Sequence, residues 1–175
     1  MSGGILVPGD FDDWRWVGVA KATSPTNPAR TLINGYSMEV WEFTNGKTLH
    51  SDGNQMPHDY KEGTEIVPHL HWSPSTTETY TGTWTMKWCE YLTVANGTAL
   101  SSEYTATVAF NSAMTAFQMQ SADFSANMVG TNRKISSIAH MSLTLALSAG
   151  TSCFLHGWDG HYIKDRLGSK QITAK

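Results

Sequence analysis

The sequence predicts an all-β protein: an antiparallel β-sandwich, jelly-roll-like, with an extended N-terminal arm. Three observations predict it. Several segments alternate apolar and polar residues with a period of two, turn-forming clusters such as TNGK, ANGT and SAGT separate them, and stretches with a helical period are almost absent. A length of 175 residues fits one domain with a real core.

Residues 1–34 are predicted to form the arm or a loop-rich lead-in, and residues 35–175 the sandwich domain. Three prolines and four glycines disfavour long regular elements in the first segment. The run Trp14, Arg15, Trp16 is the exception, because two indoles in a mobile arm would be costly to leave in water. They are expected to dock on the body or on a neighbouring subunit. The alternative is an ordinary first strand whose two indoles face the core.

From Tyr36 onward, half-buried strands are predicted, as in antiparallel sheets with one solvated face each. The predicted segments, with the residues on one face of each, are 36–43 (Tyr36, Met38, Val40), 83–92 (Trp84, Met86, Trp88), 103–110 (Tyr104, Ala106, Val108, Phe110) and 140–148 (Met141, Leu143, Leu145, Leu147). Residues 114–130 are ambiguous and leave room for one short helix.

Composition excludes several classes of protein. Charged residues make up 15% of the chain, against roughly 25% in an average soluble domain, which suits a surface spent largely on contacts. The net charge is −3 and no basic run is present, so the electrostatic footprint of a nucleic-acid-binding protein is missing. No window approaches the roughly 18 to 20 apolar residues of a membrane span, and no secretory signal is visible. We therefore expect no nucleic acid or membrane partner and a protein made soluble in a cytoplasm.

Two cysteines, Cys89 and Cys153, lie in apparent strand interiors. Although they could pair in space, a free cysteine in such a position behaves as a small buried hydrophobe. With no other cysteine, neither a disulfide scaffold nor a zinc ribbon is indicated.

The stretch PHDYKEGTEIVPHLHW, residues 57–72, holds three of the seven histidines. On a strand, Val67, His69 and His71 share one face, and two imidazoles so placed are able to chelate a metal. The alternative is that they are hydrogen-bonded cross-strand neighbours on a partly exposed face. We expect no metal and no cofactor; the candidate ligands, should a metal bind, are His69, His71 and His161, with His58, His156, Glu78 and Asp159 as other sources of a third ligand.

Motifs of catalysis are missing. The acid pairs Asp12/Asp13 and Glu39/Glu42 carry no glycosidase signature. Neither a G-x-S-x-G elbow nor a Walker loop nor a G-x-G-x-x-G is present. The sequence therefore predicts a protein that is not an enzyme and has no catalytic residues. The alternating indoles of Trp72, Trp84 and Trp88 are predicted to fill a core rather than to form a sugar-binding platform.

Four segments carry a resemblance to a known family. They are MPHDYKEGTEIVPHLHWSPS (56–75), WTMKWCEY (84–91), RKISSIAHMSLTL (133–145) and HGWDGHYIKDRLGSKQ (156–171). Together they resemble a family of small proteins encoded among the structural genes of tailed bacteriophages and prophages, over about Gln55 to Gln171. The chain departs from the family pattern late, where WDGHY replaces a D-F-H-Y type of ending and a common acidic run is reduced to SCFLHG.

The resemblance implies a virion component with a jelly-roll-like sandwich, present as a homotrimer on the particle surface. Within that class we expect a capsid decoration or cement protein that binds the head and stabilises the shell. The alternative is a tail, neck or fibre-associated protein that contacts a receptor; a metal-dependent or carbohydrate-binding β-barrel is a third class. At 19.2 kDa the chain shows no coiled-coil heptads or shaft repeats, which favours decoration.

The expected partners are the protein itself and the major capsid protein or other virion proteins, and the expected location is the virion, assembled in the host cytoplasm. In such an assembly Lys61 and Glu62 pair or cap locally, and Gly63 supplies an unusual backbone angle. The residues expected at interfaces are Trp14, Arg15, Trp16, His58, Lys61, Glu62, His69 and His71.

Overall fold

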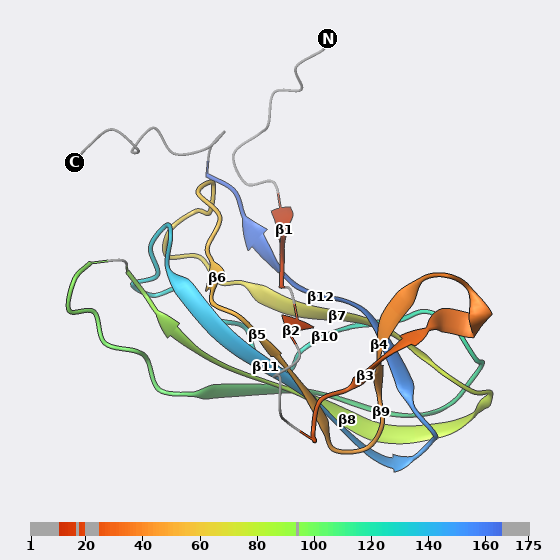
Figure 1. Ribbon diagram of the computed structural model, residues 1–175. Coiled ribbons are helices and arrows are strands. Elements are labelled where there is room, and N and C mark those ends of the chain that lie inside the picture. Colours follow the sequence, from red (N-terminus) through yellow and green to blue (C-terminus); the bar gives the residue numbers. More distant parts are fainter. Residues whose placement is uncertain (1–10, 17, 20–24, 94, 166–175) are drawn as a thin grey trace.

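The computed structural model describes residues 11–16, 18–19, 25–93 and 95–165 as a sandwich of two antiparallel β-sheets (Figure 1). Each sheet has six strands. The single helical element in these ranges is a 3-10 turn, η1 (Ile33–Gly35), and the described residues contain no helix that could span a lipid bilayer. The predicted all-β antiparallel sandwich is confirmed.

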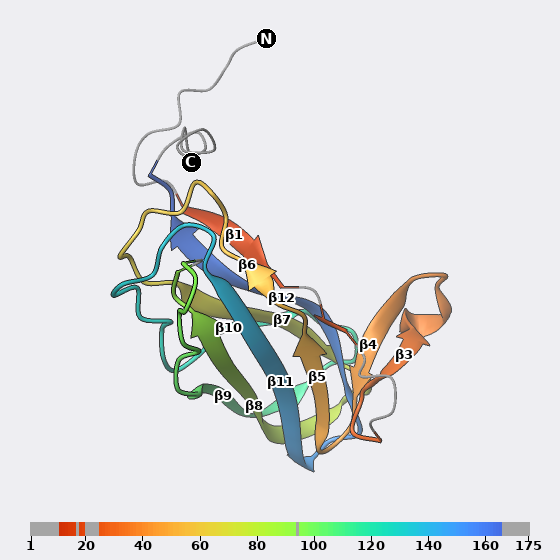
Figure 2. The same ribbon diagram turned by 60° about the vertical axis from the view of Figure 1, so that its left-hand side comes forward.

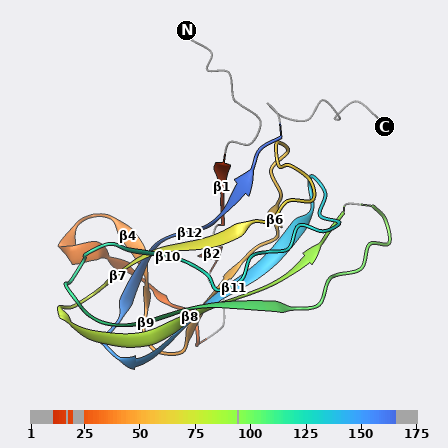
Figure 3. The same cartoon turned by 180° about the vertical axis from the view of Figure 1, so that it is seen from behind.

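The first sheet is built around strand β12. Its strand order is β10 (Gln120–Asp123), β7 (Val67–Pro74), β12 (Cys153–Ile163), β4 (Glu39–Phe43) and β3 (Ala29–Leu32). The second half of β12 pairs on its other side with β1 (Phe11–Arg15). Seen from behind, β10, β7 and β12 follow one another across this sheet (Figure 3).

The second sheet is built around strands β11 and β8. Its strand order is β2 (Gly18–Val19), β5 (Lys47–Ser51), β11 (Ile138–Ala149), β8 (Glu78–Tyr91) and β9 (Tyr104–Met114), with β6 (Asn54–Gln55) pairing the start of β11. The antiparallel ladders between β8 and its two neighbours are the longest of the fold.

Eight of the strands alternate between the sheets in the manner of a jelly roll. In the first sheet β4, β12, β7 and β10 lie side by side, and in the second β5, β11, β8 and β9 do so. Among these eight, only β8 and β9 are consecutive in the chain and neighbours in one sheet. This crossing between sheets is the jelly-roll connectivity that the sequence predicted.

The core fills the space between the two inner faces. Trp84, Met86 and Leu143 are fully buried on the second sheet, and Leu70 and Trp72 meet them from the first. Trp88 is also buried, at 4% exposure, so the prediction that the three indoles of residues 72, 84 and 88 fill a core is confirmed. The period-two pattern identified these positions because neighbouring residues on a strand face opposite sides.

The described part of residues 1–34 is built into the sheets. Strands β1, β2 and β3 pair with β12, β5 and β4. Trp14 and Trp16 are each 5% exposed and pack edge to face with one another, and Trp16 packs in the same way on Trp158. Both indoles are core residues of one chain, as the alternative prediction had it, and offer almost no surface to a neighbouring subunit. Residues 1–10, 17 and 20–24 lie outside the described residues, so the predicted arm stays a prediction there.

Two predicted segments differ from the structure. The strand expected from Tyr36 begins at Glu39, and Tyr36 and Met38 are exposed at the end of a hairpin. Side chains do alternate within β4, and Phe43 is the buried residue of this strand. Trp41 lies on the same face as Phe43 and packs against the core, so Val40 faces the other way. The ambiguous segment 114–130 contains strand β10 and no helix.

A buried ion pair joins β8 to the loop before β11. The guanidinium of Arg133 donates from Nε to Glu90 Oε2 at 2.8 Å and from Nη2 to Glu90 Oε1 at 2.6 Å. Its third donor, Nη1, bonds the carbonyl of Met128 at 3.1 Å. The two side chains are 0% and 4% exposed. A buried pair of this kind is stable only while both charges and their hydrogen bonds are present.

Both cysteines are free, as predicted. Cys153 is buried, and that burial raises the pKa of its thiol to about 12. Cys89 is half-buried rather than buried, and burial together with Glu103 and Glu90 raises its pKa as well. Neither thiol has the depressed pKa of a reactive cysteine.

Candidate functional site

The H-x-H strand carries its imidazoles on the outer face of the first sheet. Within β7, Pro68, Leu70 and Trp72 are buried, while His69 and His71 are half-buried on the opposite side. This is the arrangement that the alternation predicts. The two rings lie edge to face with their centroids 4.5 Å apart. The side chain of His69 is 15% exposed, so it is largely enclosed by its neighbours.

A β-bulge in β12 brings a third histidine to this face. Leu155 pairs with Trp72 but Gly157 pairs with His71, so His156 is an extra residue on β12. The insertion exchanges the two faces of the strand beyond it. As a result Trp158 points into the core, and His161 joins His69 on the outside with ring centroids 4.8 Å apart.

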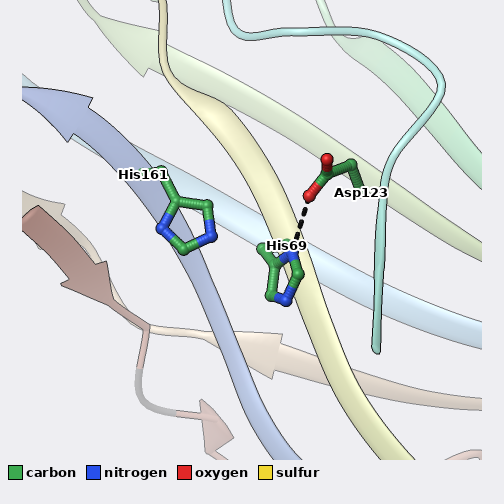
Figure 4. Close-up of side chains that lie close together, drawn as sticks. All are labelled: His69, Asp123 and His161. Atoms are coloured by element: carbon green, nitrogen blue, oxygen red, sulfur yellow. Dashed lines mark hydrogen bonds and ion pairs between the residues drawn. The ribbon is translucent and has the colours of Figure 1, made fainter. Parts of the chain in front are cut away.

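Two carboxylates complete the cluster from the neighbouring strands. Asp123 on β10 lies opposite His69, and its Oδ1 is 2.6 Å from His69 Nδ1. Asp13 on β1 lies opposite His161, and its Oδ1 is 2.8 Å from His161 Nδ1. Figure 4 shows His161, His69 and Asp123 on three successive strands of the sheet. The name outer-face cluster is used below for five residues: His69, His161, Asp13, Asp123 and Asp159.

Asp159 is the buried member of the outer-face cluster. It lies opposite His69 on one side and opposite Arg15 on the other, and it is 6% exposed. Its Oδ1 is buried without a hydrogen-bond partner among the described residues. Burial and then the nearby Asp13 raise the pKa of the Asp159 carboxyl, against the opposing effect of the neighbouring histidines. A buried carboxylate oxygen without a partner is costly, and the cost is relieved either by uptake of a proton or by a nearby positive charge.

Of the predicted ligands, the structure brings together His69, His71, His161 and Asp159 and leaves the others apart. His156 lies in the bulge, and its Nε2 is hydrogen-bonded to Ser73 Oγ at 2.8 Å. Glu78 bonds Thr151 at the end of the sandwich where β8 begins, and His58 is exposed in the turn that follows β6.

The sequence did not identify Asp123. It lies in the segment that was ambiguous between strand and helix, 54 residues from His69 in the chain. The short alternation at residues 120–123 was the available signal, but a four-residue strand is too short to set its own register.

The PHDYKEG connection is held by contacts to two distant segments. Gly63 has a φ of +81°, as predicted for this turn. Glu62 does not pair with Lys61: its carboxylate accepts from Lys134 Nζ at 2.9 Å and from the Ile135 amide at 3.0 Å. Burial by itself would raise the pKa of the Glu62 carboxyl. The hydrogen bonds from these two donors outweigh burial, so the pKa lies below its usual value. The turn is therefore tied to the loop before β11.

Comparisons with known proteins assign no family to this chain. No family model matches the sequence, and no curated protein matches it. A chain from the structure of infectious bursal disease virus Gx strain matches with a TM-score of 0.44 and 10% identity, covering 95% of this chain and 36% of the matched chain. A chain from the Gt strain matches with a TM-score of 0.26 and 11% identity, covering 94% and 53%. Both TM-scores lie below 0.5, so neither likeness supports a function for this chain.

Proposed function

We propose that this protein is a non-enzymatic structural subunit of a tailed-bacteriophage particle, a capsid decoration protein that binds the head surface as a homotrimer. Two independent lines support the proposal: the motif resemblance over about Gln55 to Gln171, and the exposed surface of the jelly-roll body. The observation that carries it is an apolar tip on the hairpin between β3 and β4.

The hairpin between β3 and β4 stands clear of the rest of the sandwich in two views (Figure 1, Figure 2). Leu32, Tyr36 and Met38 are 52%, 61% and 63% exposed. They lie within seven consecutive residues, and the Ile33 amide donates to the Met38 carbonyl at 3.0 Å, so all three belong to one hairpin end. We call these three side chains the apolar tip.

Single exposed hydrophobes are ordinary on a protein surface, but a group of them marks a contact site. The apolar tip holds three of the nine large hydrophobic residues that are exposed among the described residues. At the base of the hairpin, Arg30 pairs with Glu39 at 3.2 Å and lies over the Trp41 ring at 4.8 Å. A protruding hairpin with an apolar end suits insertion between neighbouring subunits.

The direct test is binding to heads that lack this protein. Purified protein is mixed with such heads, the particles are sedimented, and bound copies per particle are counted. We expect saturable binding at a fixed number of copies, and a free protein whose mass in sedimentation equilibrium is three times 19.2 kDa. Failure to bind heads together with binding to isolated tails would replace decoration by the tail or neck assignment.

Substitution of the apolar tip gives a second, sharper test. A triple variant Leu32→Ser, Tyr36→Ser, Met38→Ser removes the exposed apolar surface without changing the core, so we expect normal folding and at least about tenfold weaker head binding, as the loss of a few central contacts produces. The matched control replaces three other exposed hydrophobes, Leu100→Ser, Met119→Ser and Val129→Ser. Equal head binding by both variants would contradict a role for the tip.

Point substitutions are preferable to deletion of residues 1–34 in these experiments. Deletion would remove β1, β2 and β3, and with them the buried Trp14 and Trp16. A loss of binding would then report loss of the fold. The other predicted interface residues, Arg15, His58 and Lys61, are exposed, and their role in assembly stays a prediction.

A further inference from the structure

The outer-face cluster has the donor set of a metal centre. One ligand atom each from His69, Asp123 and His161 lies within 4.8 Å of the other two. Two imidazoles and one carboxylate form a common ligand set for zinc and other divalent transition metals. The donors come from β7, β10 and β12, three adjacent strands whose register the ladders fix.

The spacing of the donors requires side-chain movements of no more than about 1.5 Å, because the ligand atoms lie within 4.8 Å of one another. In a tetrahedral zinc site with bonds of about 2.0–2.1 Å, ligand atoms lie about 3.3 Å apart. The present contact between His69 Nδ1 and Asp123 Oδ1 is 2.6 Å, so it must open by less than about 1 Å. Asp123 has a 63% exposed side chain, whereas His69 lies within β7 with a 15% exposed side chain, which leaves the carboxylate as the partner that moves.

His161 is already oriented as metal-binding histidines are. Its Nδ1 is engaged by the carboxylate of Asp13 at 2.8 Å, which leaves Nε2 with its lone pair for a ligand. Figure 4 shows the His161 ring directed toward His69 from the neighbouring strand. A carboxylate on the second ring nitrogen fixes the tautomer and increases the basicity of the first.

A second observation, independent of the donor set, favours a positive ion at this place. Asp159 is 6% exposed, its Oδ1 has no hydrogen-bond partner among the described residues, and it lies opposite His69 and two residues before His161 on the same face. A buried, unpartnered carboxylate oxygen costs free energy, which an adjacent positive ion offsets.

We propose that His69, Asp123 and His161 bind one divalent transition-metal ion of the zinc class, with Asp13 positioning His161 and Asp159 compensating the charge. The ion ties the edge strand β10 to the central pair β7 and β12. The site is structural, because each donor stands on a strand of the sheet and the ion links strands that are distant in the chain. It is independent of head binding, so either proposal stands if the other fails.

The test is a metal titration of the full chain. Protein freed of metal with a chelator is titrated with ZnCl2 by calorimetry, and with CoCl2 while its visible absorption is recorded. We expect one equivalent of Zn2+ per chain, a cobalt spectrum with the strong bands of a low-coordinate site, and a higher melting temperature with Zn2+, since an ion that binds only the folded state stabilises it. Absence of saturable one-to-one binding by the unsubstituted protein would overturn the proposal.

Three variants and one control make the titration specific. His69→Asn and His161→Asn each remove a donor, and we expect dissociation constants at least about 100-fold higher, whereas Asp13→Asn removes only the positioning carboxylate and raises the constant about 10- to 100-fold. His140→Asn is the matched control, because His140 is exposed on β11 in the other sheet. Near-ultraviolet circular dichroism of the metal-free variants verifies folding. Binding that is unchanged in His69→Asn and His161→Asn would place the ion elsewhere and contradict the assignment.

Discussion

Glu90→Gln is expected to lower the free energy of unfolding by about 3–5 kcal/mol, because it leaves the Arg133 guanidinium charged and buried without its counter-charge. Arg133 is 0% exposed and makes two hydrogen bonds to the Glu90 carboxylate. A glutamine keeps the shape of the side chain but offers one acceptor and no charge. The expected fall in melting temperature is roughly 6–20 °C for a chain of this size.

The matched control is Glu103→Gln. Glu103 forms an exposed pair with Lys87 at 2.8 Å, with side chains 60% and 47% exposed. Exposed pairs contribute about 0–1 kcal/mol, so this variant should unfold close to the parent. Urea unfolding followed by far-ultraviolet circular dichroism measures the free energy of unfolding of both variants. One fixed protein concentration is used, so that self-association affects both values equally.

A paired replacement separates charge from packing. In Glu90→Leu with Arg133→Met, both charges are removed together and the volume is largely kept, and such replacements of buried pairs are often neutral or stabilising. We expect this double variant to recover most of the stability lost in Glu90→Gln. If it is as unstable as Glu90→Gln, then the bond from Arg133 to the Met128 carbonyl and local packing dominate, and the uncompensated charge is not the cause of the loss.

Trp84→Ala is the second substitution with a large expected effect, a loss of about 3–5 kcal/mol. Trp84 is 0% exposed on the inner face of β8 and contacts both sheets. Its ring centroid lies 5.0 Å from that of Phe43 and 6.1 Å from that of Trp72, which belong to β4 and β7 of the opposite sheet. Alanine would leave a cavity between the sheets that rigid strands on both sides are unable to close.

Two further variants calibrate this loss. Trp84→Phe keeps an aromatic ring and removes the indole Nε1, which is buried and has no hydrogen-bond partner in the part of the chain that the structure describes, so it should cost clearly less than alanine. Tyr91→Ala, at a residue 36% exposed at the end of β8, serves as the surface control. Chemical denaturation read by circular dichroism gives all three values. A loss at Trp84→Ala no larger than at Tyr91→Ala would contradict its central place in the core.

Much of the fold was predictable from the pattern of alternation. The alternation placed Met86 and Leu143 each on one face of its strand, because strand geometry alternates side chains strictly, and both are fully buried. The same rule put His69 and His71 on one shared face of their strand, which in the structure is the outer face. Prediction was wrong at Tyr36 and Met38, where the alternation continued past the point at which the backbone leaves the sheet.

The class of the fold, the faces of the long strands and the shared face of the H-x-H pair could be predicted from the residues, because these features depend on neighbours within one strand. Which strands lie side by side could not be predicted and is known from the three-dimensional structure. It placed Asp123 beside His69, and the bulge at His156 turned Asp159 and His161 toward the same face. Register between strands depends on packing over the whole sheet, and one inserted residue reverses every side chain beyond it.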